Sequence, residues 1–387
     1  MSPANTEPEQ SMRSRPLILA LLACCAPFPA VAAGPLQITL PPACYAVPGV
    51  AMSLYYDNIV LTEKPETFRF EVKCDIGTRE DRRWTVTPSD KDAGAHTVEI
   101  TVRDAAGNVV ERGSTVLRVA PRDAGAKREL RVLIVGDSLT AATAYPNEIA
   151  RLLGEPGNPK WTMLGTSKPS SAKPGVAHEG YGGWTWAAFL TKFAPQPPGV
   201  TAGPLAKRST SPFVYADASG RGAIDIPRYI KEECGNRPPD VVTFLLGIND
   251  CFGAKPDDLS AMDKTINAAL DNADKLLAAF HAAAPKAVLA VGLTTPPNAR
   301  ESGFEANYHG NYHRWGWKRI QHRLVQRMME RLGNRQTENI HLVPTELNLD
   351  PVDGYPENNG VHPHGPGYAQ IGASFHAWLK AWMAGKL

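Results

Sequence analysis

Three residues, Ser138, Asn249 and His362, have side chains that together could transfer an acyl group. A serine hydroxyl is a poor nucleophile unless a base accepts its proton, and a neutral imidazole is the usual base near neutral pH. The oxyanion formed when the hydroxyl attacks a carbonyl needs donors already in place, and an asparagine amide is one. The sequence thus offers a nucleophile, a base and an oxyanion donor.

These residues follow or lie near segments that are predicted to be buried strands. From residue 130 onward, apolar runs alternate with amphipathic helical stretches, which predicts a parallel sheet with helices on both faces. The runs at 130–135 and 240–246 end just before Ser138 and Asn249, and His362 precedes the last helical stretch. Ligands of such sheets bind at the carboxyl ends of the strands. We therefore expect the three residues to share one edge of the sheet.

A glycine-rich segment at residues 179–185 falls between these two strands. Gly183 lacks a side chain, so its backbone N–H can approach a ligand closely. The candidate oxyanion donors are therefore the N–H of Ser138, the N–H of Gly183 and the amide of Asn249.

The first part of the chain has a different pattern. Residues 36–119 contain short runs of alternating polar and apolar residues, separated by turn signals such as Asp104 to Asn108, and no helical pattern. This predicts a small immunoglobulin-like β-sandwich. Residues 120–130 are polar and resemble a linker. The predicted domains are a β-sandwich at 34–122 and an α/β domain at 123–387.

Residues 1–33 are predicted to be a signal peptide. Arg13 and Arg15 precede an apolar run at 16–26, and small residues follow up to a cleavage site after about Ala33. The run is too short to span a membrane, so we expect a secreted or periplasmic protein. A less favoured alternative is a lipid anchor on Cys24.

The spacing of the cysteines predicts disulfide bonds, and the charge of the chain limits the classes of binding partner. Without the signal peptide, Cys44, Cys74, Cys234 and Cys251 form two local pairs, which predicts Cys44–Cys74 and Cys234–Cys251 disulfides in an oxidising compartment. No C-x-x-C motif is present, and we expect no metal or organic cofactor. The formal net charge is only +2 and the basic residues are scattered, which argues against nucleic acid as a partner.

Four motifs resemble those of one enzyme family. GDSLT at 136–140, the glycine-rich block ending at Gly183, GIND at 247–250 and GVHP at 360–363 occur in the order found in SGNH, or GDSL-type, hydrolases. The resemblance covers residue 131 to the C-terminus. It implies a flavodoxin-like three-layer α/β/α fold, with Ser138 as nucleophile, His362 as base, and Ser138, Gly183 and Asn249 as the oxyanion hole.

The motifs depart from the family pattern at one position. The family usually has an acidic residue three positions before the histidine, where this chain has Asn359. An asparagine carbonyl can accept the imidazole Nδ1–H but carries no charge. Either Asn359 orients His362, or a carboxylate of Asp353 or Glu357 does.

The function we expect is that of a secreted serine esterase. It would remove acyl groups, most simply acetyl, from a carbohydrate or another small ester through an acyl-enzyme intermediate. Aromatic residues at 181–184 and 308–317 resemble those of the family's carbohydrate esterases; those at 308–317 either stack on sugar or simply open the next helix. The insertion at 194–223 is expected to be a surface loop bordering the pocket. Two alternatives remain: an O-acyltransferase, and a glycan-binding protein on the same scaffold.

Overall fold

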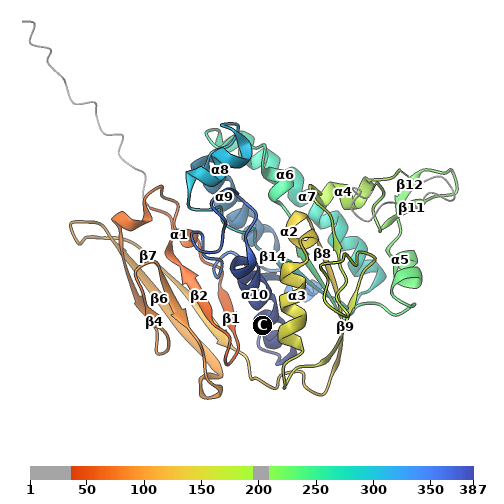
Figure 1. Ribbon diagram of the computed structural model, residues 1–387, viewed down its shortest axis with the longest axis horizontal. Coiled ribbons are helices and arrows are strands. Elements are labelled where there is room, and N and C mark those ends of the chain that lie inside the picture. Colours follow the sequence, from red (N-terminus) through yellow and green to blue (C-terminus); the bar gives the residue numbers. More distant parts are fainter. Residues whose placement is uncertain (1–35, 195–208) are drawn as a thin grey trace, which may run out of the picture. The chain divides into compact units, whose positions relative to one another are not determined.

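The computed structural model describes residues 36–194 and 209–387 (Figure 1). The predicted signal peptide, Cys24 and residues 195–208 of the predicted insertion lie outside the described residues.

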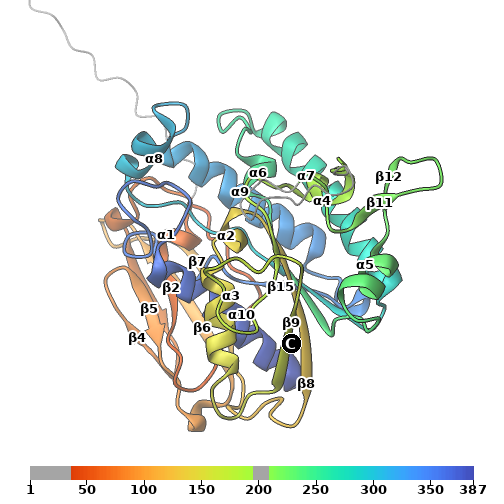
Figure 2. The same cartoon turned by 45° about the vertical axis from the view of Figure 1, so that its right-hand side comes forward.

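A parallel sheet forms the centre of the second half of the chain. Its strand order is β10-β8-β13-β14-β15, and β9 pairs with the first part of β8 while β10 pairs with its last two residues; Figure 2 shows β9 alongside β8. Every residue of β13 and β14 is buried, as the apolar, β-branched composition of these strands predicts. The strands are β8 (Glu129–Gly136), β9 (Lys160–Leu164), β10 (Glu179–Gly180), β13 (Val241–Leu245), β14 (Val288–Gly292) and β15 (Ile340–Val343).

Helices cover both faces of this sheet, which confirms the predicted three-layer α/β/α fold. On one face α3 (Ala144–Leu153) packs against α10 (Gly365–Met383), and on the other α7 (Leu259–Ala283) packs against α9 (Arg314–Leu332) (Figure 1). The shorter elements are α2 (Ser138–Ala141), α4 (Trp186–Thr191), α5 (Ile226–Glu233), α6 (Ile248–Cys251), α8 (Glu301–Tyr308), the 3₁₀ turn η3 (Gln336–Glu338) and the hairpin of β11 (Val214–Ala216) and β12 (Gly222–Ile224). Within the described ranges, no helix is both long and apolar enough to cross a membrane.

Two sheets form an N-terminal β module. One has the order β1-β7-β6-β3 and the other β2-β5-β4, and a shared apolar core includes Leu54, Trp84 and Ile100. The predicted turn at Asp104 to Asn108 joins β6 to β7. The strands are β1 (Ala43–Ala46), β2 (Met52–Tyr55), β3 (Arg69–Lys73), β4 (Thr78–Arg79), β5 (Arg83–Val86), β6 (Gly94–Arg103) and β7 (Val109–Val119), with 3₁₀ turns η1 (Pro65–Thr67) and η2 (Asp90–Asp92).

A one-turn helix, α1 (Tyr56–Ile59), corrects the expectation that the module contains no helix. It interrupts a run that reads as one strand from residue 52 to 61. The turn brings the Asn58 side chain to carbonyl groups more than 280 residues away in sequence, among them Glu346 O and Leu349 O. A pattern of local alternation cannot reveal such a contact.

Neither predicted disulfide is present, and the four cysteines of the described residues are free. Cys44 lies on β1 and Cys74 follows β3, the two edge strands of one sheet with β7 and β6 between them. Neighbouring strands are about 4.8 Å apart, so the three spacings between β1 and β3 keep the two cysteines apart. A disulfide spans only roughly 4.4–6.8 Å between Cα atoms.

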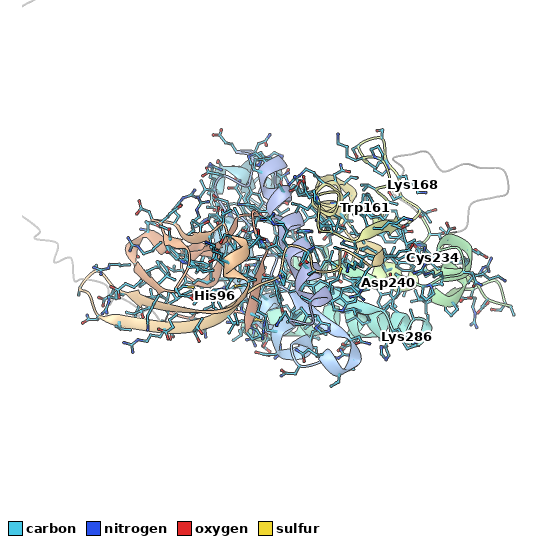
Figure 3. The ribbon with its side chains drawn as sticks, turned by 90° about the horizontal axis from the view of Figure 1, so that it is seen from below. His96, Trp161, Lys168, Cys234, Asp240 and Lys286 are labelled. Carbon is cyan, nitrogen blue, oxygen red and sulfur yellow. The ribbon has the colours of Figure 1, made fainter. Side chains whose placement is uncertain are left out.

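The second predicted pair is divided by a strand. Cys234 O and Asp240 both contact Arg131 at the start of β8, and Figure 3 labels both residues at this end of the sheet. Cys251 lies in α6, beyond the opposite end of β13. A strand of this length spans about 16 Å. Closeness in sequence is therefore misleading for this pair.

Candidate active site

Ser138 lies at the carboxyl end of β8, as its position in the sequence predicts. It is the first residue of α2, and the side chain of Asp137 caps this helix by accepting from Leu139 N at 2.9 Å. A Cβ on Gly136 would lie 2.0 Å from Thr140 Oγ1, so only glycine fits before the cap. As a first helical residue, Ser138 has a backbone N–H with no acceptor within the helix.

His362 connects the serine to Asn359. Its Nε2 lies 2.9 Å from Ser138 Oγ, and its Nδ1 lies 3.1 Å from Asn359 Oδ1. Because a carbonyl oxygen only accepts hydrogen bonds, Nδ1 carries the proton and Nε2 is free to accept from the serine hydroxyl. Burial lowers the pKa of His362. The imidazole is therefore in the form that a general base requires at neutral pH.

The structure brings Asn359, and neither of the two candidate carboxylates, to the imidazole. Asn359 Oδ1 also accepts from the backbone N–H groups of Val361 at 3.1 Å and His362 at 2.9 Å, which fixes its orientation. Asp353 instead pairs with Arg82. The Glu357 side chain is exposed, and none of its described hydrogen bonds reaches His362.

The predicted oxyanion donors Gly183 and Asn249 belong to two segments that a hydrogen bond joins, and one of these segments is tied to the end of β8. Tyr181 N donates to Gly136 O at 3.0 Å, which ties the glycine-rich block to the end of β8. Gly183 has a φ of +78°, a left-handed conformation that favours glycine. Asn249 Nδ2 donates to Trp184 O at 2.9 Å, so the amide is held beside this turn.

Glu179 anchors this block and is not among the site residues predicted from the sequence. It is fully buried, and its carboxylate accepts from Thr166 N at 2.7 Å, Thr166 Oγ1 at 2.9 Å and Tyr229 OH at 2.8 Å, and also from Tyr181 OH. A buried carboxylate is stable when it has such donors. The signal in the sequence was an acidic residue directly before the glycines, in a segment otherwise poor in charge.

Two further carboxyl groups, those of Asp137 and Asp250, lie next in sequence to Ser138 and Asn249. Burial, together with the smaller effect of the nearby Asp250, raises the pKa of Asp137 to about 7, although the hydrogen bond from Leu139 N lowers it. Burial also raises the pKa of Asp250 to about 7, although this carboxyl accepts from Trp186 N. Both carboxyl groups therefore change protonation near neutral pH. They belong to the motifs around Ser138 and Asn249, and no pattern in the sequence distinguishes them as site residues.

A groove of about 440 Å³ reaches Asn249. Most of its side chains form hydrogen bonds, and the rest are small: it is lined by Thr185, Ala187, Asn249, Asp250, Lys264, Thr265, Ala268, Ala269 and Asn272. The cavity at the seam with the β module, about 480 Å³, includes neither Ser138 nor His362 among its lining residues. The polar groove is not lined by Ser138 or His362 either, but Asn249, one of the predicted oxyanion donors, lines it, and on that ground it is the better candidate for substrate.

The aromatic segments serve mainly the core. Trp184 is buried and packs against Tyr181 and Phe189. In the segment 308–317, Trp317 is buried in α9, as the helix-opening alternative predicts, whereas Tyr312 is exposed and packs on Phe252. No group of three or more His, Cys, Asp or Glu side chains within the described ranges is arranged as metal ligands.

Comparisons with known proteins found similar solved structures and a matching family model. A search of curated proteins found no match. Among solved structures, a family 3 carbohydrate esterase of Clostridium thermocellum is 18% identical (TM-score 0.39), with 66% of this chain and 100% of that chain covered. A carbohydrate esterase family 3 structure from Talaromyces cellulolyticus is 18% identical (TM-score 0.38), with 66% and 98% covered. An acetyl xylan esterase is 14% identical (TM-score 0.33), with 64% and 98% covered.

The family comparison covers more than half of the chain. The model of the GDSL-like lipase/acylhydrolase family matches residues 132–375, a range that contains all four motifs. The chain therefore belongs to the GDSL-like lipase/acylhydrolase family and is a carboxylic ester hydrolase.

Proposed function

We propose that this hydrolase is a serine esterase that removes acetyl groups from carbohydrate through an acyl-enzyme intermediate. One observation carries the mechanism: the hydrogen-bonded line from Asn359 Oδ1 through His362 to Ser138 Oγ, with distances of 3.1 and 2.9 Å. Nucleophile, base and orienting group are already within reach of one another, as this chemistry requires.

The first step forms the acyl-enzyme. Ser138 Oγ attacks the ester carbonyl carbon while its proton passes to His362 Nε2. The N–H groups of Ser138 and Gly183 and the amide of Asn249 donate to the resulting oxyanion. The intermediate then collapses, the bond to the leaving alcohol breaks, and His362 Nε2 returns the proton to the alcohol oxygen.

The second step releases the acyl group. Water attacks the acyl carbonyl, His362 Nε2 accepts a proton from the water, and the proton then passes to Ser138 Oγ as the ester bond to the enzyme breaks. Throughout both steps, Asn359 keeps the proton of the imidazole on Nδ1. It supplies no negative charge to stabilise the imidazolium.

The groove beside Asn249 supports a hydroxylated leaving group. Its amide, hydroxyl, carboxyl and amine side chains can bond sugar hydroxyls, and its remaining lining side chains are alanines. A long acyl chain would need an apolar channel, whereas acetyl needs no apolar pocket of its own. We further propose export from the cytoplasm, on the basic, apolar and small-residue pattern of residues 1–33.

The test compares Ser138→Ala with Ser219→Ala, a change in an exposed turn. With p-nitrophenyl acetate, Ser138→Ala should lower kcat by about 10³-fold or more with an unchanged melting temperature, and Ser219→Ala should retain wild-type rates. Rapid quenching of wild-type protein should trap acetyl on the peptide that contains Ser138. Wild-type turnover by Ser138→Ala would refute the mechanism.

Substrate preference is tested separately. Acetylated xylan and acetylated oligosaccharides should release acetate, and p-nitrophenyl palmitate should be a much poorer substrate than the acetate ester. Preference for the palmitate would point to a lipase instead. Transfer of acetyl to an added sugar, in place of release as acetate, would identify the O-acyltransferase.

A further inference from the structure

The segment from Glu346 to Asp353 leads from β15 toward the loop that carries Asn359 and His362, and the β module holds much of it. Tyr55 N donates to Leu347 O at 3.2 Å, and Ser53 N donates to Asn348 Oδ1 at 2.7 Å. The Leu347 side chain is fully buried and belongs to the apolar core of the module.

Asn58 fastens the same segment from α1. Its Nδ2 donates to Glu346 O and Leu349 O, both at 2.8 Å, and the side chain is buried. Buried carbonyl groups that lose such a donor are left unsatisfied, which is costly.

Arg82 binds the next turn of the chain. Its guanidinium donates to both oxygens of Asp350, at 3.0 and 3.2 Å, and to Asp353 at 2.6 Å. Asp350 Oδ1 in turn accepts from Val352 N and Asp353 N, so the carboxylate shapes the turn that Arg82 holds.

Asn298 extends this support to the catalytic loop. The backbone N–H of its neighbour Ala299 donates to Pro351 O, next to the turn held by Arg82. The Asn298 side chain is fully buried and donates to Pro356 O at 2.8 Å and to Asn359 O at 3.0 Å. Residues 298 and 299 thus contact both the turn that Arg82 binds and Asn359, the residue that orients His362.

We propose that the β module positions the catalytic histidine, with Arg82 and Asn58 as positioning residues that act through the 346–353 segment and Asn359. This rests on the proposed role of His362 as the base. The module would then be required for the full rate, although it contributes no atom to the reaction. A module that served only as a spacer would leave the rate unaffected when Arg82 is changed.

Arg82 is the residue to change, because its side chain is about half exposed. Its partner Asp350 is buried but keeps the hydrogen bonds from Val352 N and Asp353 N, so we expect a folded variant with a lowered stability, and the melting temperature is measured beside the rate. Arg82→Ala should lower kcat for p-nitrophenyl acetate by about ten- to a hundredfold, because small displacements of catalytic groups are costly in rate. KM should change little. Arg82→Lys should restore part of the rate.

The matched control is Arg69→Ala, which removes an exposed ion pair with Glu71 inside the module. A second readout is the pH profile of kcat/KM. Burial lowers the pKa of His362, so a displaced and more hydrated imidazole should shift the acidic limb to higher pH in Arg82→Ala. In Arg69→Ala, the acidic limb of this pH profile should lie at the same pH as in the wild type.

A double-mutant cycle identifies the route. If Arg82 acts through Asn359, Arg82→Ala should have much less effect in an Asn359→Ala background than in wild type. Equal kcat and pH profiles for Arg82→Ala and Arg69→Ala, or effects that simply add in the cycle, would overturn the proposal. If Arg82→Ala lowers the melting temperature, the rate and pH profile of Arg82→Lys are used to test the proposal instead. These results are independent of Ser138→Ala, which tests the mechanism itself.

Discussion

Two groups of residues are proposed to act with Ser138, here called the oxyanion side and the histidine side, and they are held in different ways. On the oxyanion side, the glycine-rich block is anchored by the buried carboxylate of Glu179, which accepts hydrogen bonds from Thr166, Tyr181 and Tyr229. All of these residues belong to the α/β part of the chain. On the histidine side, the imidazole meets the neutral side chain of Asn359, whose loop is supported through segments that the β module holds.

The two sides differ in whether the supporting residue has a carboxyl group or a neutral side chain. A carboxylate can be buried when donors surround it, and Glu179 meets that condition away from the reacting atoms. The position that most directly affects the imidazolium has only a carbonyl dipole. We therefore expect the oxyanion side to contribute more to the rate than the group that orients His362.

The largest effect should come from the oxyanion side. Asn249→Ala should lower kcat for p-nitrophenyl acetate by about 100- to 1000-fold, since it removes one oxyanion donor. KM should change much less, because the oxyanion exists only after attack. The control is Asn311→Ala, a change at an exposed turn. A loss no larger than that of the control would exclude Asn249 from the oxyanion hole.

A smaller loss should follow on the histidine side. Asn359→Leu removes the acceptor for His362 Nδ1 and for the backbone N–H groups of Val361 and His362. General base catalysis contributes about 10²–10⁴-fold in total, and we expect a loss of about 10- to 100-fold. If this variant loses more activity than Asn249→Ala in the same assay, the ranking of the two sides is reversed.

Adding charge on the histidine side should move the pH profile. In the wild type, burial lowers the pKa of His362, so the base stays unprotonated to mildly acidic pH. In Asn359→Asp a carboxylate would favour the imidazolium and raise this pKa, so activity should be lost at a higher pH as the solution is acidified. The rate on the plateau should be equal or higher. An acidic limb that does not move would show that Asn359 does not face the titrating base.

The smallest effect on activity should come from Glu346→Gln, a change in another buried carboxyl that contrasts with Glu179. Neither oxygen of Glu346 has a hydrogen-bond partner among the described residues, and burial raises its pKa from 4.5 to about 8. Between these two pH values the folded state binds a proton that the unfolded state has released. The free energy of unfolding should therefore fall as pH rises through this window.

The measurement is urea unfolding at several pH values. Glu346 should lower the stability of the wild type by roughly a few kcal/mol between about pH 4.5 and pH 8, in addition to the effects of Asp137 and Asp250, since one pKa unit corresponds to about 1.4 kcal/mol. Glu346→Gln should flatten the decline, and the exposed Glu99→Gln should leave it unchanged. An identical slope in all three proteins would show that Glu346 is not buried as a neutral acid.

Local patterns were sufficient for much of this protein. The alternation of buried strands and amphipathic helices predicted the α/β/α fold, because a parallel sheet covered on both faces requires apolar strands such as Val241–Leu245. The positions of Ser138 and Asn249 after two buried strands also predicted that they follow the same edge of the sheet, since parallel strands bring their carboxyl ends together, and they do follow β8 and β13.

Contacts between distant segments were decided only by the tertiary structure. His362 pairs with Asn359, whereas Asp353 pairs with Arg82 of the β module. Cys234 and Cys251 are close in the sequence, yet β13 separates them in space. Such pairings depend on where the whole chain places each backbone segment. Spacing along the sequence determines that placement only within a single strand, helix or turn.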